Sequence, residues 1–73
     1  MKINGLNYHL INVKSPLYED YSFIVTTSYE NLTDEEIIDM CIENGLFDKK
    51  IEYAEVDYQY DEDDIKVLPV FNI

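Results

Sequence analysis

The sequence predicts an α+β fold, a small ββαββ antiparallel sheet with one helix packed on one face. Three observations predict it. A well-capped amphipathic segment lies in the middle of the chain, segments rich in aromatic and β-branched residues flank it, and the connections between them are short. The 73 residues include only two glycines and two prolines, and no linker-like stretch divides them, so we expect one domain over residues 1–73.

Two segments before the helix have the composition of strands. Residues 8–14 are predicted to form the first strand. Residues 15–20 are predicted to form the connecting turn, because Pro16 disfavours continuation of the strand. Residues 21–27 are predicted to form the second strand, because aromatic and β-branched side chains dominate this segment. The short connection between them favours an antiparallel hairpin.

The helix has clear start and stop signals. Thr33 and Glu36 have the spacing of a capping box, and Leu32 and Ile37 have the spacing of a hydrophobic staple. An apolar stripe then follows at helical spacing, formed by Ile37, Ile38, Met40, Cys41 and Ile42. Gly45 is placed to end the helix in a left-handed cap.

Two further strands are predicted after the helix. Residues 51–60 form the third, with Ala54, Val56, Tyr58 and Tyr60 on one face, and residues 61–64 form a charged turn. Residues 65–71 form the fourth strand, and Pro69 indicates that it lies at a sheet edge. One helix covers only one face of such a sheet, so we expect the other face to be solvated or to bind a partner.

Charge is unevenly distributed along the chain. The chain has sixteen acidic residues, five lysines and no arginine, which gives a formal net charge of −11. All the acids lie between residues 19 and 64, where Lys49 and Lys50 are the only basic residues. This balance argues against direct binding to DNA, RNA or an anionic membrane, since those ligands need a cationic surface.

The acids are predicted to form an ordered array. Glu35, Asp39 and Glu43 recur every four residues and so share a helix face, although like charges at this spacing repel. Acids also alternate along the third strand and fill the turn that follows it. Such an array imitates the regular negative charge of a nucleic-acid backbone and suits a cationic groove on another protein. The predicted partner-binding residues are Glu35, Asp39, Glu43, Tyr53, Glu55, Asp57, Asp61, Glu62, Asp63 and Asp64.

A simpler interpretation is that the acidity only keeps a small domain dispersed in solution. The seven tyrosines bear on this choice, because tyrosine is a favoured contact residue at interfaces. Tyr18, Tyr29 and Tyr53 are expected at the surface. Tyr21, Tyr58 and Tyr60 are expected to pack beneath the helix.

No motif for catalysis or cofactor binding is present, so we expect neither an enzyme nor a cofactor. The acidic run at residues 61–66 lacks the glycine of a calcium loop, and no metal site is expected. Cys41 lies on the apolar stripe and is interpreted as a core residue. His9 is interpreted as a satisfied structural residue or an exposed one, in preference to a general base. One cysteine, no apolar run of membrane-spanning length and no signal-peptide pattern favour the cytoplasm.

In its size, its lack of arginine and the acids of residues 19–64, the chain resembles the small anti-CRISPR and anti-restriction inhibitors of phages and plasmids. It is also similar in character to nuclease-immunity proteins and antitoxins. The resemblance implies a phage protein that acts as a DNA mimic in a bacterial cytoplasm, inhibiting a nucleic-acid-binding protein in a host–virus interaction. The alternatives are an immunity protein or antitoxin, or a structural module that self-associates through its open sheet face, and the chain is expected to be a monomer or such a homodimer.

Overall fold

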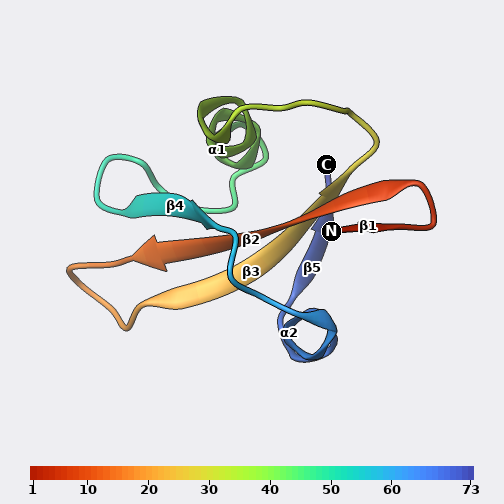
Figure 1. Cartoon of the computed structure of the whole chain (residues 1–73). Coiled ribbons are helices and arrows are strands. Elements are labelled where there is room, and N and C mark those ends of the chain that lie inside the picture. Colours follow the sequence, from red (N-terminus) through yellow and green to blue (C-terminus); the bar gives the residue numbers. More distant parts are fainter.

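The computed structural model describes residues 1–73 and has a mixed α+β fold, with an open five-stranded sheet and two helices (Figure 1). The elements in chain order are β1 (Lys2–Ile3), β2 (Leu6–Lys14), β3 (Tyr21–Thr27), α1 (Asp34–Glu43), β4 (Tyr53–Asp57), α2 (Glu62–Val67) and β5 (Val70–Asn72). The predicted ββαββ order is confirmed and is carried by β2, β3, α1, β4 and β5. None of the helices is long and apolar enough to cross a membrane.

The predicted hairpin is present, and β3 has the predicted bounds. β2 begins two residues earlier than predicted because it also pairs with β1, which the sequence interpretation missed. Asn4 and Gly5 join β1 to β2 with positive φ angles of 52° and 81°, which is the geometry of a tight type I′ turn. The Asn-Gly dipeptide was the available signal for this hairpin.

The sheet is mixed rather than wholly antiparallel, which corrects the prediction. β2 has β3 along one side, and β1 and β4 follow one another along its other side. β5 lies at the far edge and pairs with β3 in parallel. Because β4 and β5 run in the same direction at opposite edges, no hairpin can join them and the chain must cross the sheet.

The predicted third and fourth strands were therefore too long. Ile51 and Glu52 lie in a turn in which both N–H groups donate to the Asp48 carbonyl, so β4 starts only at Tyr53. Residues 61–64 are not a hairpin turn but the cap and first turn of α2. β5 keeps two residues of the predicted fourth strand, Val70 and Phe71, and extends to Asn72, and its edge position after Pro69 is confirmed.

α1 begins and ends as its sequence signals predict. The Thr33 hydroxyl accepts from the Glu36 N–H at 3.2 Å, and the Glu36 carboxylate accepts from the Thr33 N–H at 3.0 Å. These bonds lower the pKa of Glu36. At the other end, Gly45 has a φ of 69°, and Leu46 N–H donates to the Cys41 carbonyl at 3.0 Å, which completes a Schellman cap.

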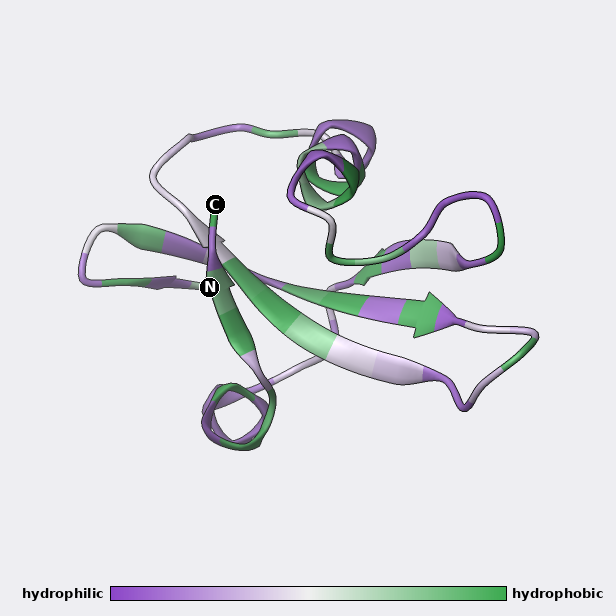
Figure 2. Cartoon of the chain, turned by 180° about the vertical axis from the view of Figure 1, so that it is seen from behind, coloured by the Kyte–Doolittle hydropathy of each residue, from purple (hydrophilic) through white to green (hydrophobic).

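The core lies between α1 and the sheet. Hydrophobic colour follows the central strands β2 and β3 in Figure 2, and α1 lies over one face of them. The buried residues of this cluster are Ile11, Val13, Phe23, Val25, Ile37, Cys41 and Phe47. Cys41 is confirmed as a core residue, and its burial raises the pKa of its thiol to about 11.

The sheet face opposite α1 is not fully open, contrary to expectation. α2 lies on this side, and the chain between β4 and β5 crosses here (Figures 1 and 2). Leu10 of β2 and its cross-strand neighbour Ile24 of β3 point to this face, and so does Thr26, two residues further along β3. All three side chains are buried. The same face also carries polar side chains, among them Ser22, whose hydroxyl donates to the Asn12 side chain at 2.6 Å.

Candidate functional site

An acidic groove runs between α1 and β4. It has a volume of about 530 Å³ and is lined by Asp34, Glu35, Ile38, Asp39, Tyr53, Ala54, Glu55 and Val56. Half of these residues are acidic and none is basic. The groove therefore concentrates negative charge in a concave surface, where field lines are focused.

The groove depends on how α1 sits against the edge strand. Asp34 and Ile38 are one helical turn apart, so the capped start of α1 presents both on the side that faces β4. β4 turns Ala54 and Val56 toward the same core cluster against which Ile38 packs. These three half-buried side chains give the groove an apolar floor beside the carboxylates of α1. Glu55 alternates with Ala54 and Val56 along β4, so its side chain has the direction of its cross-strand neighbour Asn12.

The groove carboxylates have no lysine partner. Ion pairs hold only three of the 16 acidic side chains, joining Lys2 to Glu30, Lys14 to Asp20 and Lys66 to Asp63. In the groove, one acid has a side-chain partner of another kind, since the Tyr58 hydroxyl donates to Asp34. This hydrogen bond raises the pKa of Tyr58.

The structure brings four of the ten predicted residues together in this groove, namely Glu35, Asp39, Tyr53 and Glu55. Glu43 is exposed at the last turn of α1, beyond the groove lining. Asp34 was missed, although its position four residues before Ile38 was the signal that it shares the groove side of the helix.

Asp57 does not join the groove. Its carboxylate accepts from the Asn12 amide and from the Gln59 N–H, both at 2.8 Å. The Gln59 and Asn12 hydrogen bonds lower its pKa. Asp57 therefore belongs to a polar network with Asn12 and Ser22 on the sheet face away from α1.

The four predicted acids of residues 61–64 are also separate from the groove, because α2 lies on the other side of the sheet (Figure 1). Asp61 caps α2 by accepting from the N–H groups of Asp63 and Asp64, and Asp64 accepts from the Asp61 N–H at 3.1 Å. Asp63 pairs with Lys66 at 4.0 Å, and Glu62 has no partner. Three of these four acids thus have structural contacts within their own helix.

The tyrosines only partly follow expectation. Tyr18, Tyr29 and Tyr53 are exposed, as predicted. Tyr58 does not pack beneath the helix, since it is 71% exposed and reaches Asp34 from the loop after β4. Tyr60 also lies in that loop, and its hydroxyl donates to the Tyr8 carbonyl.

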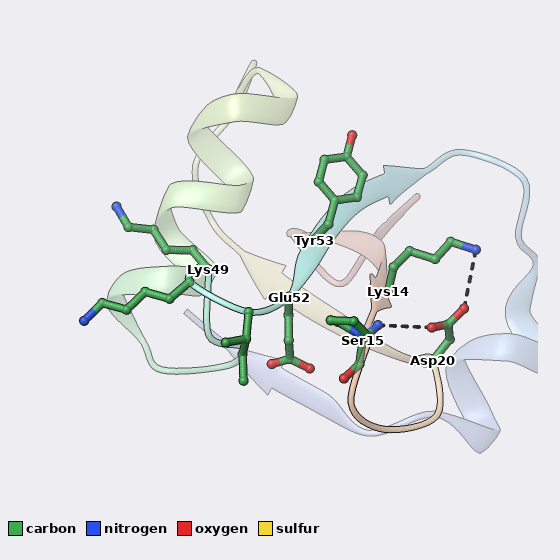
Figure 3. A pocket seen from close by; sticks show the side chains of 9 residues that line it. Lys14, Ser15, Asp20, Lys49, Glu52 and Tyr53 are labelled. Atoms are coloured by element: carbon green, nitrogen blue, oxygen red, sulfur yellow. Dashed lines mark hydrogen bonds and ion pairs between the residues drawn. The ribbon is translucent and has the colours of Figure 1, made fainter.

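Lysines gather at one end of the molecule. A second hollow, of about 450 Å³, has Lys14, Lys49 and Lys50 among its lining residues. Figure 3 shows Lys14 turned toward Asp20, at 3.6 Å, while Lys49 points away on the opposite side of the hollow. The ammonium groups do not converge, so this hollow lacks the geometry that an anion site needs.

His9 lies on the sheet face that carries α1. Its Nε2 is buried without a hydrogen-bond partner. Burial and the positive N-terminus lower the pKa of His9, and Asp34 opposes them by raising it. His9 is therefore mainly neutral near pH 7. Its ring is held in the sheet with one nitrogen unsatisfied, so it is neither the satisfied structural residue nor the exposed one that the sequence suggested.

The fold and the groove define a small α+β protein with one uncompensated acidic groove at a sheet edge. Comparison with known proteins finds no matching family model, no similar curated protein and no similar solved structure. No three His, Cys, Asp or Glu side chains are grouped in a way that could hold a metal ion.

Proposed function

We propose that the chain is a small acidic interaction protein that inhibits a nucleic-acid-binding protein by occupying its cationic groove. The target is a nuclease or a defence effector of the CRISPR or restriction type, in the cytoplasm of a bacterial host. The observation that carries the proposal is the row of α1 acids Asp34, Glu35 and Asp39 along one open groove, which Glu55 of β4 also lines and which has no lysine among its lining residues.

The chemistry of the groove suits basic side chains that normally hold phosphates. An arginine or lysine of the partner can lay its aliphatic stem along Ile38, Ala54 and Val56 while its charged end meets the carboxylates. The ring of Tyr53, which is 65% exposed, offers a cation–π contact at the same place.

The arrangement of charge supports mimicry over simple dispersal in solution. Dispersal requires net charge but no particular position, whereas here acids repeat along one helix face and continue onto a neighbouring strand. Glu35, Asp39 and Glu43 repel one another at one-turn spacing, with no basic residue in the last turn of α1 to offset them. A binding role explains why this unfavourable spacing is present.

The proposal is tested by capture from a nuclease-treated bacterial lysate on the immobilised chain. At about 50 mM salt we expect nucleic-acid-binding proteins to be retained, and at about 500 mM salt we expect them to elute, because salt screens exposed charges. Identification of the captured proteins also distinguishes a defence effector from a toxin with its own immunity protein.

Two variants that each remove three negative charges test whether capture depends on the groove acids or only on net charge. The groove variant combines Glu35→Gln, Asp39→Asn and Glu55→Gln, and the control variant combines Glu19→Gln, Glu62→Gln and Asp63→Asn. We expect the affinity of the groove variant for the captured proteins to fall at least about threefold, since three exposed charge contacts contribute about 0.2–1 kcal/mol each, and that of the control variant to change little. Equal losses in both variants, or no retention at low salt, would contradict the proposal.

A further inference from the structure

The outer edge of β5 is open. All three residues of this strand are exposed, Val70 to 46% and Phe71 to 40%. On the inner side, the Pro69 carbonyl accepts from Ile24 N–H and the Ile73 N–H donates to the Thr26 carbonyl, both at 2.8 Å. Because backbone groups alternate along a strand, Val70 and Asn72 direct their N–H and C=O groups outward, away from β3.

The two edges of the sheet differ in their protection. β4, at the opposite edge, carries Glu55 and Asp57, and charged side chains are a common way to prevent edge-to-edge pairing. β5 carries no charged side chain, and Lys66 is the only one in residues 65–73. The negative charge of the molecule therefore opposes contact with another copy less at the β5 edge than at the β4 edge.

An aromatic row on the α1 face leads to this edge. Tyr21 stacks on Phe23 with ring centres 6.3 Å apart, and Phe23 meets Phe71 edge-on at 5.7 Å. Phe71 ends the row on the outermost strand, so an apolar contact surface accompanies the free backbone groups.

We infer that β5 pairs antiparallel with β5 of a second copy of this chain, about a two-fold axis at Phe71. In this register Val70 of each copy lies opposite Asn72 of the other, and their outward backbone groups exchange four hydrogen bonds. The two Phe71 side chains then face each other in the closely spaced, non-hydrogen-bonded position and join the two aromatic rows.

A second copy fits this edge because the pattern of outward groups is self-complementary about Phe71, as a two-fold interface requires. The acidic groove lies at the opposite edge, on β4, so both grooves stay open in the dimer. The pairing does not depend on the proposed function. Only three residues pair and each copy carries −11, so the dimer is weak and reversible, and salt strengthens it.

Sedimentation equilibrium of the full chain tests the pairing, at protein concentrations up to about 1 mM and at low and high salt. We expect a monomer–dimer equilibrium whose dissociation constant falls at least about threefold between about 50 and 500 mM salt. This is the opposite of the salt effect expected for groove binding. A monomer under all these conditions would overturn the inference.

Two variants with the same added charge locate the contact. Val70→Glu places a carboxylate at the paired edge, and Ile51→Glu places one at an exposed site in the turn before β4. We expect Val70→Glu to abolish the dimer and Ile51→Glu to keep it, with both chains folded by circular dichroism. A dimer that survives Val70→Glu would rule out the β5 edge.

Cross-linking tests the register. Phe71→Cys brings two thiols into the position at which cross-strand Cβ atoms are about 4.5–5.5 Å apart, close enough for a disulfide after slight adjustment. Cys41 is fully buried and cannot compete. We expect mild oxidation to link Phe71→Cys into a covalent dimer much faster than Tyr18→Cys, which lies at an exposed site in the β2–β3 turn. Equal rates would contradict the two-fold axis at Phe71.

Discussion

The two helices begin in nearly the same way and end in different roles. Each starts with a capping box, at Thr33 in α1 and at Asp61 in α2, and each has three acids in its first turn. α1 then continues for ten residues and buries Ile37 and Cys41, whereas α2 has six residues and buries none. The residues that follow the capping box therefore decide whether a helix builds the core.

The acids of the two helices differ as well. In α2, Asp61 and Asp64 satisfy the helix start and Asp63 has a lysine partner. In α1, Glu35 and Asp39 line the groove without a lysine. An equal density of carboxylates in the sequence thus gives a structural cap in one place and a free charged surface in the other.

The largest expected contrast is in the free energy of unfolding. Ile37→Ala removes a side chain that is 2% exposed in the core, so we expect a loss of about 3 kcal/mol. Ile65→Ala in α2 removes a partly exposed side chain and should cost about 1 kcal/mol or less. Urea unfolding of both variants checks this. Similar losses would mean that α2 contributes to the core as α1 does.

The two caps should be equivalent, in contrast to the helices they start. Thr33→Ala and Asp61→Ala each remove a side chain that accepts from the first backbone N–H groups, and each should cost about 1 kcal/mol of unfolding free energy. Thermal unfolding measures both. If Asp61→Ala had no effect while Thr33→Ala did, the acids of α2 would not act as a cap.

Replacing one acid by lysine should change the free energy of unfolding in opposite directions in the two helices. Asp39→Lys replaces two repulsions, with Glu35 and Glu43, by two attractions and should stabilise the chain by about 0.5 kcal/mol. Glu62→Lys puts a positive charge in the first turn of α2 and should destabilise it by a similar amount. Asp39→Lys should also weaken capture of the partner, which would separate binding from stability. Destabilisation by Asp39→Lys would show that the acidic row is structural.

The smallest expected effect is a pH dependence of the free energy of unfolding that arises from His9, on the sheet face that carries α1. The pKa of His9 is held below its ordinary 6.5, so the unfolded chain binds the proton more readily. Stability from this residue is present above about pH 6.5 and is lost as the pH falls through the lower folded pKa. Urea unfolding at about pH 7.5 and 5.5 should show a decrease that His9→Leu reduces. An unchanged decrease in His9→Leu would assign it to other groups.

The parts of the fold with local signals were predictable. The capping box of Thr33, the left-handed cap at Gly45 and the β3 segment were all read from neighbouring residues. The parallel position of β5 was not, because strand order depends on which edge remains free once β4 has paired with β2. The same type of local signal was available for α2 at Asp61, but the acidic run was interpreted as a turn.

For the site, the sequence indicated which residues were acidic and exposed but not which would meet. Glu35 and Asp39 could be grouped by helical spacing, and Glu55 by its strand. Their meeting follows from the crossing of α1 over β4, which is a tertiary contact. Asp57 was predicted to belong to the site but lies outside it. Its hydrogen-bond partner Asn12 is 45 residues away in the chain, so no local pattern indicated this contact.

The central claim is that the groove competes with nucleic acid for a cationic surface. The most direct measurement is the fluorescence anisotropy of a labelled DNA duplex bound to the protein captured from lysate, during titration with the chain. We predict that the chain displaces the duplex, that more duplex reverses this, and that the Glu35→Gln, Asp39→Asn, Glu55→Gln variant displaces it at least about threefold less effectively. A ternary complex in which duplex and chain bind together would contradict the account.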